Sequence, residues 1–324
     1  MARFPIIERL LGASAGWSDE TRGLWLGFIG MVAFGITLPM TRLAVGPAEL
    51  PQLDPVFVTA GRAAIPGVLS IFYLLWRRAQ WPARHHYLPL AVCALATVVG
   101  FPIFLALALR HVHAMHAAVI TGILPLASAV AGAIYFRQRP SLGFWACALV
   151  GCILVAGYAV ARGGGQLTTA DGLLLCAIIV TAIGFLGGTE VSGERPAPEV
   201  ICWILAFSLP ATIPVAWLTF PESTADIAWQ AWGGLLYVAL FSMWLGFFFW
   251  YRGLALGGMV RVSQVQLLQP FVSLVTAIPI LGERLDAMTV LFMLAVMATV
   301  FASRKMPVGK PRPRRPKPPS QARM

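Results

Sequence analysis

The sequence predicts an all-α integral membrane protein with ten transmembrane helices. Of its 324 residues, 58% are hydrophobic and 11% are charged, whereas soluble domains have about 45–50% and about 25%. Nine long stretches contain no Asp, Glu, Lys or Arg, and a tenth is interrupted only by Arg62. Because each crossing of a bilayer needs about 20 residues, ten spans leave loops too short for a sizeable aqueous domain.

Short connections separate the expected helices. Charged residues set most of their limits, such as Arg22 before the first span, Arg77 after the second and Arg110 between the third and fourth. Each stretch is close to the length that crosses a bilayer as a helix. In chain order, we expect helices over residues 24–41, 55–76, 85–109, 111–136, 140–161, 172–189, 200–221, 227–251, 262–282 and 287–303.

The distribution of positive charge predicts the orientation. With both termini in the cytoplasm, 19 of the 24 Lys and Arg residues fall on the cytoplasmic side and four on the opposite side. This is the bias that multi-pass proteins show, so the net charge of +11 indicates topology and no nucleic-acid partner. The first 23 residues lack the layout of a cleavable signal peptide, and we expect them to remain on the mature protein.

The tail from Pro307 onward is rich in Pro and in positive charge, which predicts disorder. It could bind a partner with an aromatic groove, but contact with anionic lipid is the favoured interpretation. The five cysteines all lie in apolar stretches, where they act as small hydrophobic residues. Six tryptophans near span ends are expected to anchor the helices at the headgroup boundary: Trp25, Trp76, Trp81, Trp217, Trp229 and Trp250.

The chain contains a weak internal repeat. A shift of 145 residues places Pro125 on Pro270, both near the middle of a span, and Arg139 on Arg284, both just after that span. Five spans per repeat make the two halves cross the membrane in opposite directions. We therefore expect an N-terminal segment (1–22), two inverted five-helix repeats (23–161 and 162–304) and a basic tail (305–324).

Two stretches resemble the signature of the drug/metabolite transporter superfamily, in its EamA-type branch. They are WYRGLALGGMVRVSQVQLLQPFVSLVTAIPILGERL (250–285) and its first-half copy HAAVITGILPLASAVAGAIYFRQRPSL (116–142), and VTAGRAAIPG (58–67) is similar to the second helix of that family. The first-half copy departs from the pattern, with Arg137 and Gln138 where the second half has Gly282 and Glu283. The resemblance implies two five-helix repeats, a central cavity and movement of small metabolites, often amino acids, across the bacterial inner membrane. It implies no cofactor.

Polar side chains along the ninth span are candidates for lining that cavity. Gln266, Gln269, Ser273 and Thr276 are spaced by three, four and three residues and so share one helical face. For the hydroxyl groups, hydrogen bonding between helices is the favoured interpretation. For the two glutamines, a position lining the cavity is the favoured interpretation, because a primary amide has four hydrogen-bonding sites to satisfy. The polar first-half counterparts of this stripe are Thr121 and Ser128.

Three prolines are candidate hinges. Pro39, Pro125 and Pro270 interrupt apolar spans, and a proline inside a helix removes a backbone hydrogen bond. Kinks alone are the common result, but the equivalent places of Pro125 and Pro270 predict a symmetric pair of bends that serves alternating access.

Two further side chains are cavity candidates. Arg62 lies seven residues after Pro55, about 10 Å along a helix, and can either snorkel to the interface or bind a substrate carboxylate. Trp244 lies well inside the eighth span and is expected to form part of an apolar wall.

Proton coupling is left open by the sequence. The acidic residues lie in termini, loops or span ends, which favours facilitated diffusion, but Glu190 or His116 could carry a proton. The sequence also contains three closely spaced histidines that could suggest a metal site, His111, His113 and His116. In a continuous helix, however, residues 111 and 113 point to opposite sides. We therefore expect no metal site.

Two other functions compete with transport. An intramembrane enzyme needs paired carboxylates, an activated nucleophile or a metal motif, and no span contains one. A receptor or assembly protein is disfavoured because the loops leave little surface for an aqueous partner. The expected function is thus an exporter or facilitator of small metabolites, without a predicted oligomeric state.

Overall fold

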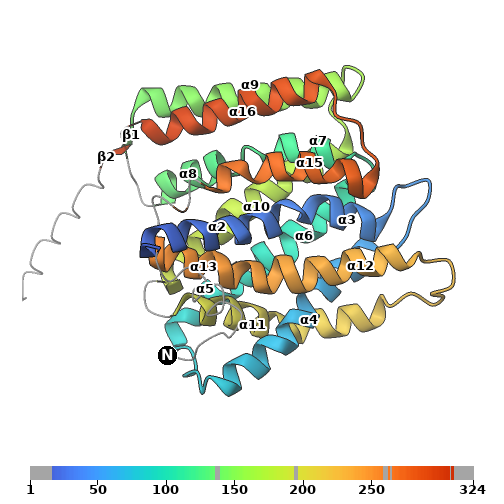
Figure 1. Ribbon diagram of the computed structural model, residues 1–324, viewed down its shortest axis with the longest axis vertical. Coiled ribbons are helices and arrows are strands. Elements are labelled where there is room, and N and C mark those ends of the chain that lie inside the picture. The colour runs from blue at the N-terminus through green and yellow to red at the C-terminus, as the bar shows by residue number, and fades with distance from the viewer. Residues whose placement is uncertain are drawn as a thin grey trace, which may run out of the picture.

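The computed structural model describes residues 17–135, 139–192, 196–257, 262, 265–306 and 308–309. Within these ranges the regular secondary structure is helical, apart from Arg139–Pro140 (β1), which pairs antiparallel with Val308–Gly309 (β2). The rest of the predicted C-terminal tail lies outside the described residues. The helices run side by side along one direction (Figure 1).

The structure confirms the predicted fold class of ten transmembrane helices. Eight helical segments are long and apolar enough to span a membrane, and two shorter apolar helices complete the set. The spans are numbered in chain order and comprise α2 (Asp19–Gly35) with α3 (Thr37–Val45); α4 (Pro55–Trp76); η1 (Arg84–His86), α5 (Tyr87–Cys93), η2 (Ala94–Gly100) and α6 (Phe101–Ala108); α7 (Ala114–Thr121) with α8 (Leu124–Tyr135); α9 (Leu142–Arg162); α10 (Thr169–Ser192); α11 (Ala197–Leu218); α12 (Trp229–Tyr237), η3 (Val238–Leu245) and α13 (Gly246–Gly257); η4 (Gln266–Leu268) with α15 (Gln269–Leu281); and α16 (Ala287–Lys305).

Side-chain caps fix where several spans begin. Ser18, Asp54, Ser141 and Asp286 each accept a hydrogen bond from a backbone N–H in the first turn of the helix that follows. These are the residue types that satisfy the free donors of a helix N-terminus. Polar residues in the short loops thus define the first residue of these helices, which the apolar pattern alone does not define.

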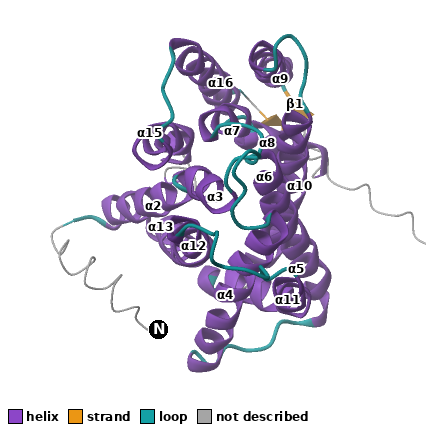
Figure 2. Ribbon diagram, turned by 90° about the vertical axis from the view of Figure 1, so that its right-hand side faces the viewer, coloured by secondary structure: helices purple, strands orange, loops and turns teal. Residues whose placement is uncertain are grey.

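The packing of the spans repeats across the two halves. Span 1 packs along span 8, and span 6 packs along span 3, which is the same pairing with the halves exchanged. Spans 2 and 7, 4 and 9, and 5 and 10 also pack on one another. Figure 2 shows α9 and α16 together at one edge of the bundle and α4 and α11 at the opposite edge. Exchanging the halves leaves this set of contacts unchanged, as expected for two related repeats.

Spans 1 and 8 approach each other backbone to backbone. A methyl group at Gly23 would lie 2.2 Å from the backbone nitrogen of Gly257, and one at Gly253 would lie 2.6 Å from that of Gly27. Small residues four apart allow such close approach of membrane helices. Trp250 is buried against this contact at 7% exposure, so its expected role as an interface anchor is wrong.

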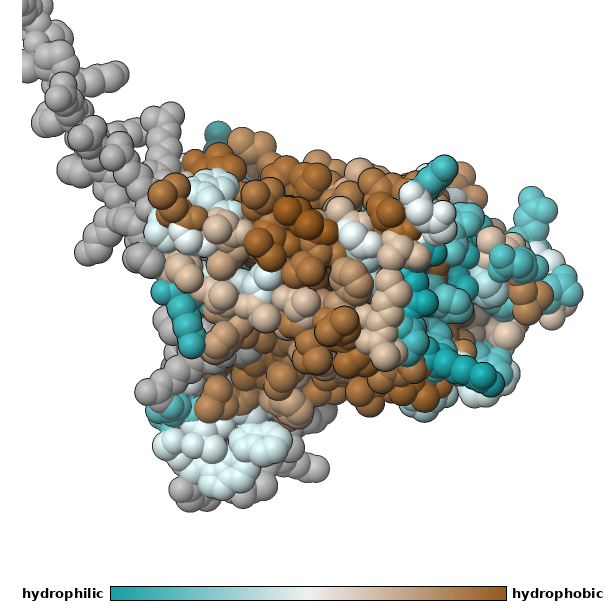
Figure 3. Space-filling model, turned by 90° about the horizontal axis from the view of Figure 1, so that it is seen from above, coloured by the Kyte–Doolittle hydropathy of each residue, from teal (hydrophilic) through white to brown (hydrophobic). Residues whose placement is uncertain are grey.

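The surface matches a membrane-embedded bundle. On the face shown in Figure 3, apolar side chains cover a broad band across the middle of the molecule, and hydrophilic residues gather at one end. The other five tryptophans that were expected at the interface are between 51% and 82% exposed. Hydrocarbon is the solvent that makes such an exposed apolar band stable.

Two equivalent spans contain a stretch of π-helix. These stretches are η2 in span 3 and η3 in span 8, and the shift of 145 residues places 94–100 on 239–245. The π-helix is rare and occurs mostly as short insertions, frequently near functional sites. The two halves therefore share a local irregularity as well as an order of helices.

Candidate functional site: a polar centre at the break in span 1

Span 1 is broken in the middle and lies tightly against span 9. Helix α2 ends at Gly35, Ile36 forms a turn, and α3 begins at Thr37. A methyl group at Gly35 would lie 2.6 Å from Val272 Cγ1 and 3.2 Å from the carbonyl oxygen of Gln269. Only a glycine permits this approach, which places the break beside the start of α15.

Hydroxyl groups from spans 8 and 9 meet the backbone at this break. Ser273 Oγ donates to the carbonyl oxygen of Gly35, and the Tyr237 hydroxyl donates to that of Ala33 over 3.3 Å. Thr37 Oγ1 lies 2.7 Å from Ser242 Oγ, which belongs to the π-helical stretch η3. The interior of three spans therefore contains a polar centre, which is costly in hydrocarbon unless it is satisfied internally or meets a ligand.

The three candidate hinge prolines all follow breaks in their spans. Pro125 is the second residue of α8, after the turn at Gly122 and Ile123. Pro270 is the second residue of α15, after the 3-10 turn η4. Pro39 is the third residue of α3. Spans 1, 4 and 9 are thus discontinuous, and a proline at the start of the second segment cannot donate the hydrogen bond that would continue the helix across the break.

The predicted polar stripe on span 9 separates into two groups. Gln266 and Gln269 are both half-buried around the break in that span, and Ser273 bonds across to span 1. Thr276 instead donates to the carbonyl of Val272 in its own helix, as Thr121 does to Ala117 and Ser128 to Leu124. Ser273 and the backbone of Gln269 therefore lie at the polar centre, whereas the other hydroxyls bond within their own helices.

Arg62 is buried in span 2 without an acidic partner in the described part of the chain. Its side chain belongs to a residue that is 3% exposed, and its Nε and Nη1 atoms have no hydrogen-bond partner among the described residues. Helix α4 packs on η3 as well as on α11 and α6, so span 2 flanks the same π-helical stretch that reaches Thr37. A buried guanidinium with unused donors is a candidate anchor for an anionic group.

Trp244 does not lie in the polar centre. Its ring packs edge to face on Phe248, with 5.2 Å between the centroids, and it borders the apolar cluster that includes Cys202 and Trp203 of span 7. An apolar wall is the role that the sequence predicts for it, but the contacts place this wall between spans 7 and 8.

Glu283 joins the two halves at one end of the bundle. Its carboxylate accepts hydrogen bonds from the backbone N–H groups of Ala114, at 2.6 Å, and Met115, at 2.9 Å. These are free donors at the start of α7, where the helix dipole also favours negative charge. The loop after span 9 is thereby fastened to the start of span 4.

A second polar network lies at the same end and contains His116. Its Nε2 atom is 2.7 Å from Asp171 Oδ1, and both residues are buried. The other carboxylate oxygen of Asp171 accepts from the N–H and hydroxyl of Thr168, which makes a capping box at the start of α10. The side chain of Glu190, the other proton-linked candidate, lies outside the described residues.

The network continues to spans 5 and 10. The Tyr158 ring lies 5.2 Å from the His116 ring, and its hydroxyl is 3.2 Å from Thr289 Oγ1. Arg162 bonds Asp286. Slight burial raises the pKa of Asp286, but hydrogen bonds from Thr289 and Arg162 outweigh it and hold that pKa below its usual value.

An apolar cavity of about 560 Å³ lies between spans 4, 5 and 6. Ile120, Val155 and Ile178 line it, and Asp171 is one of its few polar neighbours. Because Asp171 already carries three hydrogen bonds, this cavity offers packing space rather than polar recognition.

Comparison with known proteins identifies the family. The pattern of the EamA-like transporter family matches residues 21–159 and 168–304, the two halves that pack symmetrically. The chain belongs to the EamA-like transporter family. It is 43% identical over 288 residues to a protein named "Uncharacterized transporter YdeK" of Bacillus subtilis (strain 168), covering 89% of this chain and 99% of that protein.

A solved structure supports the fold. It is described only as "Crystal structure of protein", and it aligns with a TM-score of 0.58 at 16% identity over 88% of this chain and 96% of its own. As an EamA-like transporter, the protein is a multi-pass membrane protein that acts on small molecules. The family predicted from the motifs at 250–285 and 116–142 is confirmed.

Sequence reasoning missed several residues of this EamA-like transporter that the structure brings together. Thr168 and Asp171 form the T-x-x-D pattern of a capping box, which the sequence does display. Glu283 belongs to the stretch 250–285 that carries the family resemblance, but its partners are backbone groups, which a sequence motif does not identify. Tyr237 and Ser242 carried no signal, because their hydrogen bonds depend on where span 1 breaks.

Proposed function

We propose that this transporter is an exporter or facilitator of amino acids or related carboxylate-bearing metabolites, which cross by alternating access around the polar centre. Gln266, Gln269 and Ser273 of span 9 and the broken backbone of span 1 would contact the polar part of the substrate. Thr121, Ser128 and Thr276, which were also predicted to line the cavity, would act at the margin of the polar centre, and Trp244 would act from the apolar wall between spans 7 and 8.

The observation that carries this proposal is the buried Arg62. A guanidinium presents several donors in a fixed fork that fits a carboxylate, and burying it without a partner is costly. None of the ion pairs found among the described residues involves Arg62. A substrate carboxylate would supply the missing acceptors during each transport cycle.

The breaks in spans 4 and 9 support alternating access. In repeats of opposite orientation, bending at Pro125 and at Pro270 would act on opposite ends of the cavity. Glu283 would help to close one end, since it fastens span 4 to the loop after span 9.

Counterflow in proteoliposomes tests the proposed substrate class. Vesicles loaded with one unlabelled amino acid are diluted into a trace of the same labelled compound, across a panel of amino acids. We expect transient accumulation of at least one of them. Arg62→Gln should reduce that uptake at least about tenfold, because a charge-assisted bidentate pair is lost, whereas the exposed Arg252→Gln should change it less than about twofold. Absence of counterflow for the whole panel would refute the substrate class.

Proton exchange is a second candidate mechanism, supported by the buried pair of His116 and Asp171. The charged or titratable neighbours of this pair are Tyr158 and Arg162 of span 5, and His113 and Glu283 near the start of α7. If His116 carries the proton, His116→Gln should abolish accumulation driven by a pH gradient and preserve counterflow. Equal loss of both activities would leave His116 a structural role.

We further propose that the protein lies in the bacterial inner membrane with both termini in the cytoplasm, as its charge distribution indicates. Reporter fusions after residues 82 and 308 should behave as cytoplasmic, and one after residue 223 as external. Cytoplasmic activity of the fusion at 223 would contradict this orientation.

A further inference from the structure

We propose that a pocket at the end of span 2 binds the phosphate of an anionic phospholipid headgroup. The pocket has a volume of about 380 Å³ and lies between the end of α4, the loop before span 3 and the start of α11. This end of the bundle is the one at which span 1 begins and span 10 ends (Figure 1). Arg62, the residue proposed to bind the substrate carboxylate, lies in the same helix, α4, 15 residues before Arg77, or about 22 Å along the axis.

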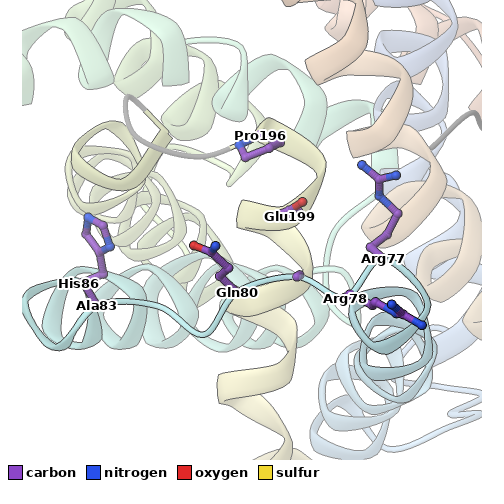
Figure 4. Close-up of a pocket in the computed structure, with 8 residues that line it drawn as sticks. Arg77, Arg78, Gln80, Ala83, His86, Pro196 and Glu199 are labelled. Atoms are coloured by element: carbon purple, nitrogen blue, oxygen red, sulfur yellow. The ribbon is translucent and has the colours of Figure 1, made fainter. Parts of the chain in front are cut away.

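The lining is rich in hydrogen-bond donors. Arg77 and Arg78 lie on one side and His86 on the other, with Gln80 and Glu199 between them (Figure 4). The lining thus contains two guanidinium groups and one carboxylate, which leaves an excess of positive charge. Guanidinium donors fit the oxygens of a phosphate.

The two arginines are held in place by different means. Arg77 is in hydrogen-bonding contact with Tyr73 of the last turns of α4, and its buried Nε–H has no hydrogen-bond partner among the described residues. Arg78 has a φ of +48°, the one positive φ of a non-glycine residue in the described part of the chain. Hydrogen bonds from the backbone N–H groups of Arg78 and Ala79 to the carbonyls of Leu75 and Leu74 hold this left-handed conformation at the end of α4.

Exposed aromatic and apolar side chains place the pocket at the level of lipid headgroups. Trp76 and Trp81 are 64% and 66% exposed, and Phe72 and Leu75 on the preceding turn of α4 are similarly exposed. The Trp81 indole N–H donates to the Tyr87 hydroxyl over 2.8 Å, which fixes the two rings side by side. Indole and phenol rings gather where hydrocarbon meets headgroups, so acyl chains can cover this surface while the phosphate enters the pocket.

A lipid fits these observations better than a free anion does. A soluble phosphate would use the arginines but not the exposed aromatic surface beside them. Arginines near an anionic membrane surface each strengthen lipid binding by roughly 1 kcal/mol, or about fivefold. The expected preference is therefore for a lipid with net negative charge over a zwitterionic lipid with the same chains.

The test is native mass spectrometry of the full chain in neutral detergent, titrated with palmitoyl-oleoyl phosphatidylglycerol or the matching phosphatidylcholine. Wild type should retain phosphatidylglycerol at least about tenfold more tightly than phosphatidylcholine. The variant with Arg77→Gln and Arg78→Gln should lose this preference. Arg84→Gln, an exposed arginine of the same loop that does not line the pocket, should stay within about twofold of wild type.

Glu199→Gln provides a test that does not depend on weakening the fold. Removal of the one opposing carboxylate should tighten phosphatidylglycerol binding. Equal retention of the two lipids by wild type, or unchanged binding in the double variant and in Glu199→Gln, would overturn the proposal. Displacement of the lipid by millimolar inorganic phosphate would also overturn it, in favour of a free-anion site.

Discussion

Spans 4 and 9 occupy equivalent places in the two halves, yet among the described residues only span 9 has a side chain near its break that bonds a neighbouring span. Both are interrupted before a proline, Pro125 in one and Pro270 in the other. The break in span 9 has two half-buried glutamines and a serine that bonds span 1. In span 4, the hydroxyls near the break bond only their own helix.

This difference indicates a division of roles between similar elements. The repeat conserves the geometry of a broken span, while recognition groups are concentrated in the second half. Glu283 extends the asymmetry, because the residue 145 positions earlier is Gln138, a neutral amide whose structure lies outside the described residues. The two halves are thus related in shape and different in chemistry.

The largest effect is expected where span 9 touches span 1. Gly35→Leu would drive a side chain into Val272 and the backbone of Gln269, and such overpacking without room to relax prevents native assembly. We expect the yield of monodisperse protein in detergent size-exclusion chromatography to fall at least about tenfold. Gly132→Leu in span 4, where a methyl group would meet no atom within 4 Å, should fold normally. Equal yields would show that the close contact is not required.

Replacing the glutamines tests whether the polar side chains of span 9 take part in transport. Gln266→Leu and Gln269→Leu should each reduce transport about tenfold or more while leaving expression within about twofold, because the amides serve substrate or water in the cavity. Thr121→Val, at the position that matches Gln266, should leave transport nearly unchanged. The measurement is uptake normalised to folded protein. Parallel loss of transport and folded protein would assign the amides to helix packing.

Removing the Glu283 carboxylate tests the contact between the halves. Glu283→Ala would leave the buried N–H groups of Ala114 and Met115 without an acceptor, which costs about 1–3 kcal/mol. The thermal unfolding midpoint in detergent should fall measurably. The neighbouring exposed Arg284→Ala should have little effect, and an equal shift in both variants would contradict a specific contact.

The smallest effect distinguishes two serines at matched positions. Ser273→Ala removes the hydrogen bond to Gly35 and should cost about 1 kcal/mol, whereas Ser128→Ala removes a bond within its own helix and should cost less than about 0.5 kcal/mol. Thermal stability of the two variants, measured side by side, checks the difference. Indistinguishable variants would remove Ser273 from the polar centre.

Composition and periodicity were sufficient to predict the ten spans, because the bilayer imposes both length and polarity. They did not predict that Gly23 and Gly253 bring spans 1 and 8 together, since small residues are common in any apolar chain. The polar stripe on span 9 was visible in the spacing of Gln266, Gln269 and Ser273. The partner of Ser273 at the carbonyl of Gly35 was not, because a backbone carbonyl becomes available only where a helix breaks.

Single cysteines at positions 121 and 266 provide the most direct test of alternating access by the two inverted repeats. Their labelling by a membrane-impermeant maleimide, applied from each side of proteoliposomes, reports which end of the cavity is open. Pro125→Ala and Pro270→Ala let each broken helix continue and should therefore bias the transporter toward opposite sides. Alternating access predicts labelling that shifts in opposite senses in the two variants, with slower transport in both. Unchanged labelling and transport, or a shift in the same sense, would contradict it.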